Sequence, residues 1–162
     1  MGSENKKPVF EDILAAAARI APYAHVTPVL QSASINELVG AELFFKCENF
    51  QRAGAFKFRG ACNAVWNLDE QAASNGVVTH SSGNHGAALA LAAKTRNIPA
   101  YIVVPNGANP AKLKAIEQAG GKITFCDNTM KGRDDAADKI RQQTGAAMVH
   151  PYPYVDVIAG QG

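Results

Sequence analysis

Lys57 lies in a stretch, Phe50 to Gly60, whose residue types could do nucleophilic chemistry. It stands between Phe56 and Phe58, just after the small and flexible Ala53-Gly54-Ala55. Apolar neighbours disfavour the ammonium form and lower a lysine's pKa, which leaves an amine able to form a Schiff base. A solvated surface lysine at a helix start is the alternative, because most lysines are exposed. Whether Lys57 is a reactive or a solvated lysine has to be decided from the other motifs in the chain.

A second chemical stretch, His80 to Gly86, joins an expected strand to an expected helix. Its two glycines let a ligand approach the backbone, and Ser81, Ser82 and Asn84 offer hydroxyl and amide groups. Ligands bind at the carboxyl ends of parallel strands, where helix N-termini present free N–H groups. The stretch therefore predicts a site for a carboxylate or a phosphate, unless Ser and Asn only cap the helix.

Other site chemistries find little support in the sequence. A Ser-His-Asp hydrolase is disfavoured because there is no Gly-x-Ser-x-Gly elbow, and no acidic partner can be assigned to His85 near Ser82. Neither a Walker A motif nor a Gly-x-Gly-x-x-Gly fingerprint occurs. The four histidines are spread out, so we interpret them as local hydrogen bonders. Lys112 and Lys114 are interpreted as a solvated helix face, and the aspartates near Asp134 as an exposed helical edge.

Composition excludes several classes of protein. The 162 residues are 47% hydrophobic and 19% charged, which is typical of a soluble globular chain. A net charge of +2 with scattered basic residues argues against a nucleic-acid or membrane partner. Cys47, Cys62 and Cys126 suit neither a disulfide framework nor a zinc site, so we expect a reducing, cytoplasmic compartment. The polar start, Met1 to Phe10, lacks the apolar segment of a signal peptide.

Strands and helices alternate regularly from Gly76 onward. The expected strands are Val77–His80, Ala100–Val104, Lys122–Phe125 and Ala146–His150. The expected helices are Asn84–Arg96, a helix capped by Asn109 that reaches Ala119, and Thr129–Thr144. This alternation predicts right-handed βαβ units, a four-stranded parallel sheet and an α/β sandwich.

The first 75 residues offer helices but no sheet for them to cover. The expected elements are a helix at Glu11–Tyr23, a short helix with a capping box at Ser34–Glu37, a strand at Glu42–Cys47 and a helix near Phe58–Asn67. The chain stops at a glycine-rich turn, Ile158 to Gly162, that resembles the entry to another helix. We expect two domains, with the partner of the N-terminal half cut off.

The two chemical stretches together resemble the serine racemase and serine/threonine dehydratase family, which are fold-type II pyridoxal-phosphate enzymes. The residues that carry the resemblance are Phe44–Glu48, Gly54–Ala61, Thr79–Gly86, Pro99–Pro105, His150-Pro151 and Ala159–Gly162. It covers about residues 10 to 162. It implies a tryptophan synthase β-like fold, with an incomplete large domain at 1–68, a near-complete small domain at 69–154, and a return to the large domain at 155–162.

The resemblance also implies roles for individual residues. Lys57 would be the Schiff-base lysine, Phe56 would pack against the cofactor ring, and Asn84 would hydrogen-bond its phenolic oxygen. The loop that binds the substrate carboxylate would comprise Ser81, Ser82, Gly83, Asn84 and His85. Racemisation needs an acid/base group on each face of a planar carbanion. Lys57 would serve one face and Ser82 the other, with some nearby group to assist this weakly basic hydroxyl.

The reaction and the completeness of the site stay open at this point. The expected function is racemisation of serine, with β-elimination to pyruvate and ammonia. A threonine/serine dehydratase is the alternative, as is a non-catalytic truncated isoform that acts only as a partner. The family's glycine-rich phosphate loop and its acidic metal ligands should lie downstream of Gly162. Full-length members should form homodimers and use a divalent metal (Mg or Ca) and ATP. We therefore expect a fragment or truncated isoform that binds pyridoxal phosphate weakly.

Overall fold

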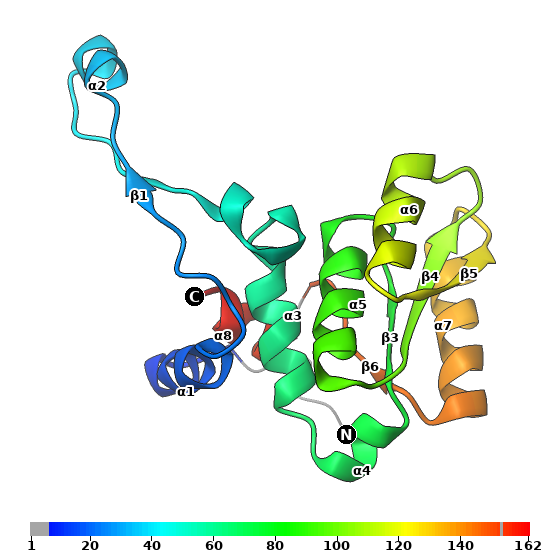
Figure 1. Ribbon diagram of the computed structural model, residues 1–162. Coiled ribbons are helices and arrows are strands. Elements are labelled where there is room, and N and C mark those ends of the chain that lie inside the picture. Colours follow the sequence, from blue (N-terminus) through cyan, green and yellow to red (C-terminus); the bar gives the residue numbers. More distant parts are fainter. Residues whose placement is uncertain (1–6, 153) are drawn as a thin grey trace.

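A parallel four-stranded sheet forms the centre of the computed structural model, which describes residues 7–152 and 154–162 (Figure 1). Its strands are β3 (Val77–His80), β4 (Ala100–Pro105), β5 (Lys122–Cys126) and β6 (Ala147–Met148), in the order β5-β4-β3-β6. The connecting helices are α5 (Asn84–Arg96), α6 (Pro110–Gln118) and α7 (Met130–Thr144). The predicted parallel α/β unit is confirmed, although β6 is shorter than the expected strand at 146–150.

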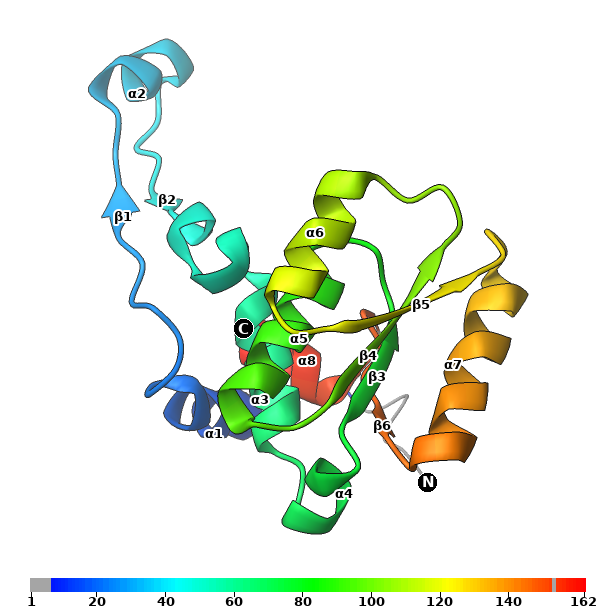
Figure 2. The same cartoon turned by 45° about the vertical axis from the view of Figure 1, so that its right-hand side comes forward.

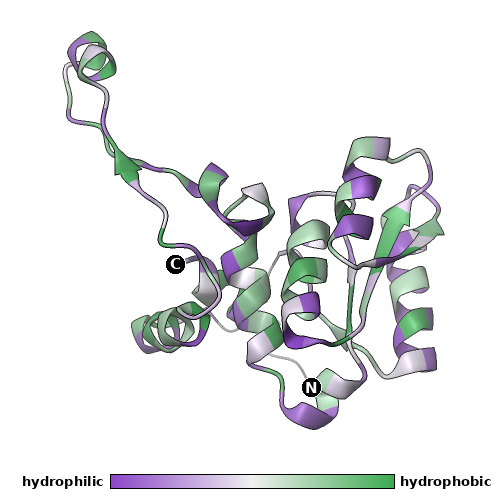
Figure 3. Cartoon of the chain, viewed as in Figure 1, coloured by the Kyte–Doolittle hydropathy of each residue, from purple (hydrophilic) through white to green (hydrophobic). Residues whose placement is uncertain are grey.

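Helices cover both faces of this sheet. Figure 2 shows α5 and α6 on one face and α7 on the other. On the first face, Leu89 of α5 and Ile116 of α6 pack with Ile102 in one buried cluster. On the second face, Val103 packs with Ile140 of α7 in another cluster. Because both faces are covered, β3 is buried along its whole length and β4 at every position but Tyr101, and β4 is largely apolar (Figure 3).

The strand order reverses direction at β3. From β3 the chain moves outward through β4 to β5, and α7 then returns it to β6 on the other side of β3. Such a reversal is a topological switch point, where the loops that follow two neighbouring strands diverge and leave room for a ligand. The loops after β3 and β6 meet at this point.

A second layer of helices packs beyond α5. Helix α3 (Lys57–Trp66) lies between α5 and two further helices, α1 (Phe10–Ile20) and α8 (Val155–Gln161), and a short helix, α4 (Glu70–Ser74), follows it. The segment 158–162, expected to be a glycine-rich turn at the entry to a helix, lies within the second half of α8 up to Gln161, so a helix is present but it begins earlier, at Val155. A Cβ on Gly60 would lie 2.4 Å from the Val157 carbonyl oxygen, and one on Gly160 would lie 2.6 Å from Cβ of Asn63. These glycines permit close helix packing.

An arm, defined here as residues 28–47, projects from this body (Figure 1). It contains β1 (Val29–Leu30), α2 (Ala33–Val39) and β2 (Phe45–Lys46), with the two strands paired antiparallel. The expected strand at Glu42–Cys47 is therefore reduced to two residues. The capping box predicted at Ser34–Glu37 is also wrong, because α2 begins earlier and Ser32 is its N-cap residue.

None of the helices within the described ranges is long and apolar enough to cross a membrane.

Candidate active site

A cavity of about 300 Å³ lies at the switch point of the sheet. Its walls come from the start of α3, the loop after β3, the first turn of α6 and the segment after β6. The lining residues are Phe56, Lys57, Ser81, Gly83, Asn84, His85, Lys112, Pro151 and Tyr152. Six of the seven predicted site residues are thus brought together. The seventh, Ser82, is half-buried and is not among these lining residues.

A tight turn positions Lys57 at the cavity. Two 3₁₀ turns, η1 (Glu48–Phe50) and η2 (Arg52–Gly54), connect the arm to α3. Ala53 and Gly54 adopt left-handed backbone conformations, with φ of 60° and 68°. Glycine suits such a φ, whereas a residue with a Cβ is strained there. The turn reverses the chain so that α3 begins at Lys57.

The Lys57 amine has a partly apolar environment. Its Nζ donates a hydrogen bond to the Pro151 carbonyl oxygen at 3.4 Å and lies 5.1 Å from the centre of the Phe56 ring. The Tyr152 ring centre is 5.6 Å away. Burial lowers the pKa of Lys57 below its ordinary value, because desolvation penalises the ammonium form. The shift is in the direction of the neutral, nucleophilic amine that the sequence predicts.

The loop between β3 and α5 is closely packed on one side and open on the other. A Cβ on Gly86 would lie 2.1 Å from the Ser81 carbonyl oxygen, so only glycine fits there. A Cβ on Gly83 would meet nothing within 4 Å. Gly83 immediately precedes α5 and lines the cavity, where the N-terminus of that helix presents free N–H groups. This arrangement suits a carboxylate.

His85 is a neutral member of this loop. Its Nε2 lies 3.3 Å from the Val149 carbonyl oxygen, an acceptor that requires the proton on Nε2. Burial lowers the pKa of His85 to about 4, and the hydrogen bond to Val149 opposes that shift only in part. Nδ1 is buried and has no hydrogen-bond partner within the described part of the chain. His85 thus brings no positive charge to the cavity near neutral pH.

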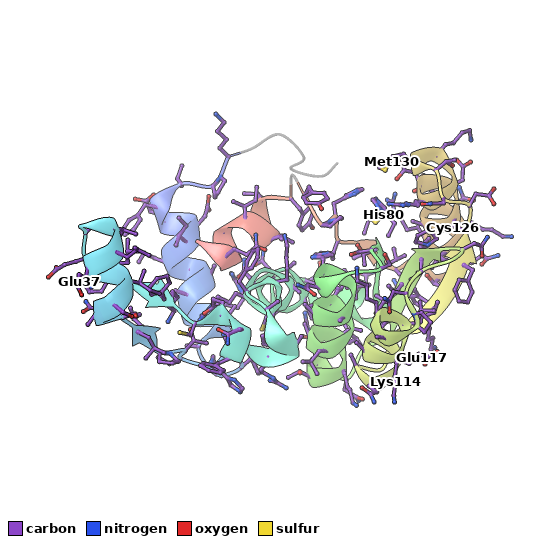
Figure 4. The ribbon with its side chains drawn as sticks, turned by 90° about the horizontal axis from the view of Figure 1, so that it is seen from above. Glu37, His80, Lys114, Glu117, Cys126 and Met130 are labelled. Atoms are coloured by element: carbon purple, nitrogen blue, oxygen red, sulfur yellow. The ribbon has the colours of Figure 1, made fainter. Side chains whose placement is uncertain are left out.

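A polar cluster lies behind the loop, between β3 and α7. His80 Nε2 is 3.4 Å from Asp134 Oδ1, and the His80 ring meets the His150 ring edge-on with centres 5.6 Å apart. Figure 4 shows His80 beside α7. Burial lowers the pKa of His80, and Asp134 offsets part of that effect. The aspartates near Asp134 form an exposed helical edge, as predicted, and Asp134, whose side chain is 51% exposed, also contacts His80.

An ion pair fixes the base of the arm to the first turn of α3. Glu48 accepts hydrogen bonds from Arg59 Nε at 2.8 Å, from Arg59 Nη2 at 2.6 Å and from the Thr27 hydroxyl at 2.5 Å. The hydrogen bond from Arg59 is the main reason that the pKa of Glu48 falls to about 2. Nearby, the Gln51 side chain bonds both the backbone N–H and the carbonyl of His25. These contacts hold the turn that presents Lys57.

Sequence reasoning missed three residues of the cavity wall. Lys112 was interpreted as part of a solvated helix face, and Pro151 and Tyr152 received no role, yet all three line the cavity. Pro151 and Tyr152 follow β6, so their place depends on the strand order, which local patterns do not reveal. Lys112 lies in the first turn of the helix after β4, and its position next to the strand's carboxyl end is the signal that could have found it.

The wall residues fit the cofactor that the sequence suggests. A lysine amine of lowered pKa, an aromatic ring at 5.1 Å from it and a helix N-terminus suit an aldehyde-bearing aromatic ring and an anionic substrate group. In contrast, no group of three or more His, Cys, Asp or Glu residues could hold a metal ion in the ranges 7–152 and 154–162.

The chain belongs to the family described as pyridoxal-phosphate dependent enzymes, whose model matches residues 20–162. It has the fold of the fold-type II members.

Serine racemase of Arabidopsis thaliana is 53% identical over 161 residues, covering 98% of this chain and 49% of that protein. The beta-hydroxyaspartate dehydratase of Paracoccus denitrificans is 50% identical over 155 residues, covering 96% and 49%. The solved structure of maize serine racemase matches with a TM-score of 0.94 and 48% identity, covering 96% and 47%. The chain thus spans about half the length of these relatives.

Proposed function

We propose that this chain supplies the reactive amine and the substrate loop of a pyridoxal-phosphate-dependent serine racemase that also eliminates serine to pyruvate and ammonia. The observation that carries the proposal is the meeting of the Lys57 amine and the Ser81–His85 loop at one cavity. The similarity to serine racemases from plants supports the choice of reaction. Small amino acids are the substrates proposed.

The site residues predicted from the sequence have proposed parts in the chemistry. Pyridoxal phosphate, when bound, supplies an electron sink for negative charge at the substrate Cα. Lys57 binds the cofactor and moves the Cα proton on its side, which a neutral amine can accept. Phe56 packs against the cofactor ring, and Asn84 donates to its phenolic oxygen. The N–H groups of the loop bind the substrate carboxylate, and their fixed positions orient Cα towards Lys57.

Ser82 is the proposed acid/base group on the opposite face. Its hydroxyl would return a proton to Cα after Lys57 has removed one, which inverts the configuration. We expect Ser82→Ala to abolish racemisation of serine while elimination continues. Chiral analysis of the serine pool, together with pyruvate measurement, tests this expectation. Racemisation that survives in Ser82→Ala would show that another group serves this face.

A dehydratase without racemase activity is the second candidate. Elimination needs the Lys57 amine and a proton for the departing hydroxyl, and it needs no group on the second face. Ser82 is not among the residues that line the cavity, which favours this candidate. The beta-hydroxyaspartate dehydratase among the relatives supports the same class of reaction. Turnover of serine, threonine and 3-hydroxyaspartate, with product analysis, separates the two candidates.

Cofactor binding can be tested on the chain itself. Pyridoxal phosphate bound to a lysine amine absorbs in the visible, so adding the cofactor should produce a band that free cofactor lacks. The band should disappear in Lys57→Ala and persist in Lys114→Ala, a matched change on α6 outside the cavity wall. A band of equal height in Lys57→Ala would overturn the proposal for this lysine.

The remaining expectations concern the complete enzyme. We propose the division into domains at 1–68, 69–154 and 155–162, together with a homodimer and a cytoplasmic location. Divalent metal and ATP are proposed as ligands of residues outside this chain. Size-exclusion chromatography of a full-length relative tests the homodimer, and metal and nucleotide titrations test the two ligands.

A further inference from the structure

The chain contains two Asn-Gly pairs, Asn75-Gly76 and Asn106-Gly107. This dipeptide is chemically labile, because glycine has no side chain to shield its backbone nitrogen and turns easily towards the asparagine before it. That nitrogen can attack the amide carbon of the asparagine side chain, Cγ, and form a five-membered imide. The attack needs a free nitrogen and a backbone that can move, and the two pairs differ in both respects.

The fold holds Asn75-Gly76 in place just before β3. The Gly76 N–H donates to the Ala73 carbonyl oxygen at 2.8 Å, and the Gly76 carbonyl oxygen accepts from the Ala147 N–H at 2.9 Å. A Cβ on Gly76 would lie 2.4 Å from the Pro99 carbonyl oxygen, so the backbone has little room to turn. Gly76 is buried as well. Its nitrogen is therefore neither free nor mobile.

Asn106-Gly107 lies in the turn between β4 and α6 (Figure 1). Both residues are exposed, and a Cβ on Gly107 would meet nothing within 4 Å. Gly107 has a left-handed φ of 81°, which glycine adopts at little cost. The bond that closes the turn runs from the Ala108 N–H to the Pro105 carbonyl oxygen at 3.2 Å. Neither the Gly107 N–H nor the Asn106 side chain hydrogen-bonds any residue that the structure describes.

We propose that Asn106 is a site of spontaneous deamidation, whereas the fold protects Asn75. The Gly107 nitrogen forms a bond to Asn106 Cγ, the bond from Cγ to the side-chain nitrogen breaks, and ammonia leaves with the proton of the Gly107 N–H. Water then opens the imide at one of its two carbonyls. One opening gives aspartate, and the other gives isoaspartate, in which the main chain runs through Cγ.

Both products change the turn that leads into α6. Each carries a new carboxylate, and isoaspartate also adds a methylene to the main chain. Helix α6 begins at Pro110, and its Lys112 lines the cavity at the switch point of the sheet. The modification therefore lies close to the candidate active site, although the reaction itself does not depend on the proposed function.

The test follows both asparagines in the same folded chain. The chain is incubated at mildly alkaline pH and digested at acidic pH, where the reaction is slow. Chromatography and mass spectrometry then resolve each peptide into its asparagine, aspartate and isoaspartate forms. We expect Asn106 to be converted about tenfold faster than Asn75, as for one hydrogen bond that must break before Gly76 can react.

Urea provides the control for local sequence. In urea that unfolds the chain, the two rates should become similar, because the Gly76 nitrogen is then released. Asn106→Gln should remove isoaspartate from its peptide, and the matched variant Asn75→Gln should leave the rate at Asn106 unchanged.

The opposite results overturn the inference. Equal rates in the folded chain, or faster conversion of Asn75, would do so. An Asn106 that is stable in the folded chain over a period in which it reacts in urea would also do so. If the difference between the two rates persists in urea, local sequence rather than the fold sets it, and the inference is wrong.

Discussion

At the scale of single residues, Lys57 combines an apolar environment with the lack of a charged hydrogen-bond partner among the described residues. It is partly buried among apolar groups, which favours the neutral amine, and its only hydrogen bond to the described residues goes to a neutral carbonyl, that of Pro151. No carboxylate within the described residues pairs with it, and the Pro151 carbonyl and the rings of Phe56 and Tyr152 stabilise its ammonium form only in part. The sequence motif predicted this residue because Phe56 and Phe58 adjoin it in the chain.

Acetylation should reveal the lowered pKa of Lys57. Because burial disfavours the ammonium form and lowers the pKa of Lys57, its amine should react faster with acetic anhydride between pH 7 and 9 than the amine of the exposed Lys114. Peptide mass spectrometry after brief labelling measures both rates. Equal reactivity at every pH would contradict the partly desolvated environment.

His85 should make the protein sensitive to mild acid. Its pKa falls from 6.5 when unfolded to about 4 when folded, so the unfolded chain binds more protons between these values. Stability is therefore lost as pH falls through this window. From pH 7 to pH 4.5 the His85 contribution should cost about 2 kcal/mol of unfolding free energy. Urea unfolding at both pH values measures the loss, and His85→Gln should show a smaller one. An identical loss in the variant would refute this origin.

Ion pairs of different burial should contribute differently at the scale of elements. Glu48 is 19% exposed and holds Arg59 with two hydrogen bonds, whereas Glu70 is 94% exposed and pairs with Arg96. Glu48→Gln should lower the unfolding free energy by about 2 kcal/mol at pH 7, because charged hydrogen bonds at a partly buried site are lost. Glu70→Gln should change it by less than about 1 kcal/mol.

The pH dependence of unfolding provides an internal control for the stabilising effect of Glu48. The pKa of this carboxyl is lowered from 4.5 to about 2, so its stabilisation is present above pH 4.5 and lost as pH falls towards 2. The difference between wild type and Glu48→Gln should therefore shrink in that range. Chemical denaturation at pH 7 and pH 3 measures it, and a difference that stays constant would argue against the ion pair.

Local patterns predicted the elements around the sheet better than those of the arm. The cap at Asn109 forms as expected, because side-chain caps depend on neighbours in the chain, and the helix expected from Thr129 begins at Met130 with Thr129 as its cap. The helix through Gly160 was mistaken for a turn, because glycine there serves packing against α3 rather than backbone freedom. Pro151 and Tyr152 could not be assigned to the cavity without the strand order, which depends on contacts distant in sequence.

At the scale of the whole molecule, the arm is the part that we expect to promote self-association. It carries exposed apolar side chains, among them Leu38 at 83% and Phe44 at 63% exposed, whereas the core lies around the four-stranded sheet. Large exposed apolar patches favour association. The arm therefore presents bare apolar surface to solvent.

Self-association should therefore depend on the arm. The average mass from sedimentation velocity should rise with concentration for the wild-type chain. The double variant Leu38→Glu with Phe44→Glu should reduce that rise, since charge opposes burial of the patch. Met130→Glu is the control, because Met130 is also exposed but lies on α7, far from the arm in Figure 4. An equal effect of both variants would show that the arm has no special part.

The identity of the lysine that binds the cofactor tests the central claim most directly. The chain is incubated with pyridoxal phosphate, the attached cofactor is fixed by borohydride reduction, and the modified lysine is located by peptide mass spectrometry. We predict that the phosphopyridoxyl group is found mainly on Lys57, because its amine lies in the cavity with a lowered pKa. Modification spread evenly over exposed lysines, with Lys57 unmodified, would contradict the account.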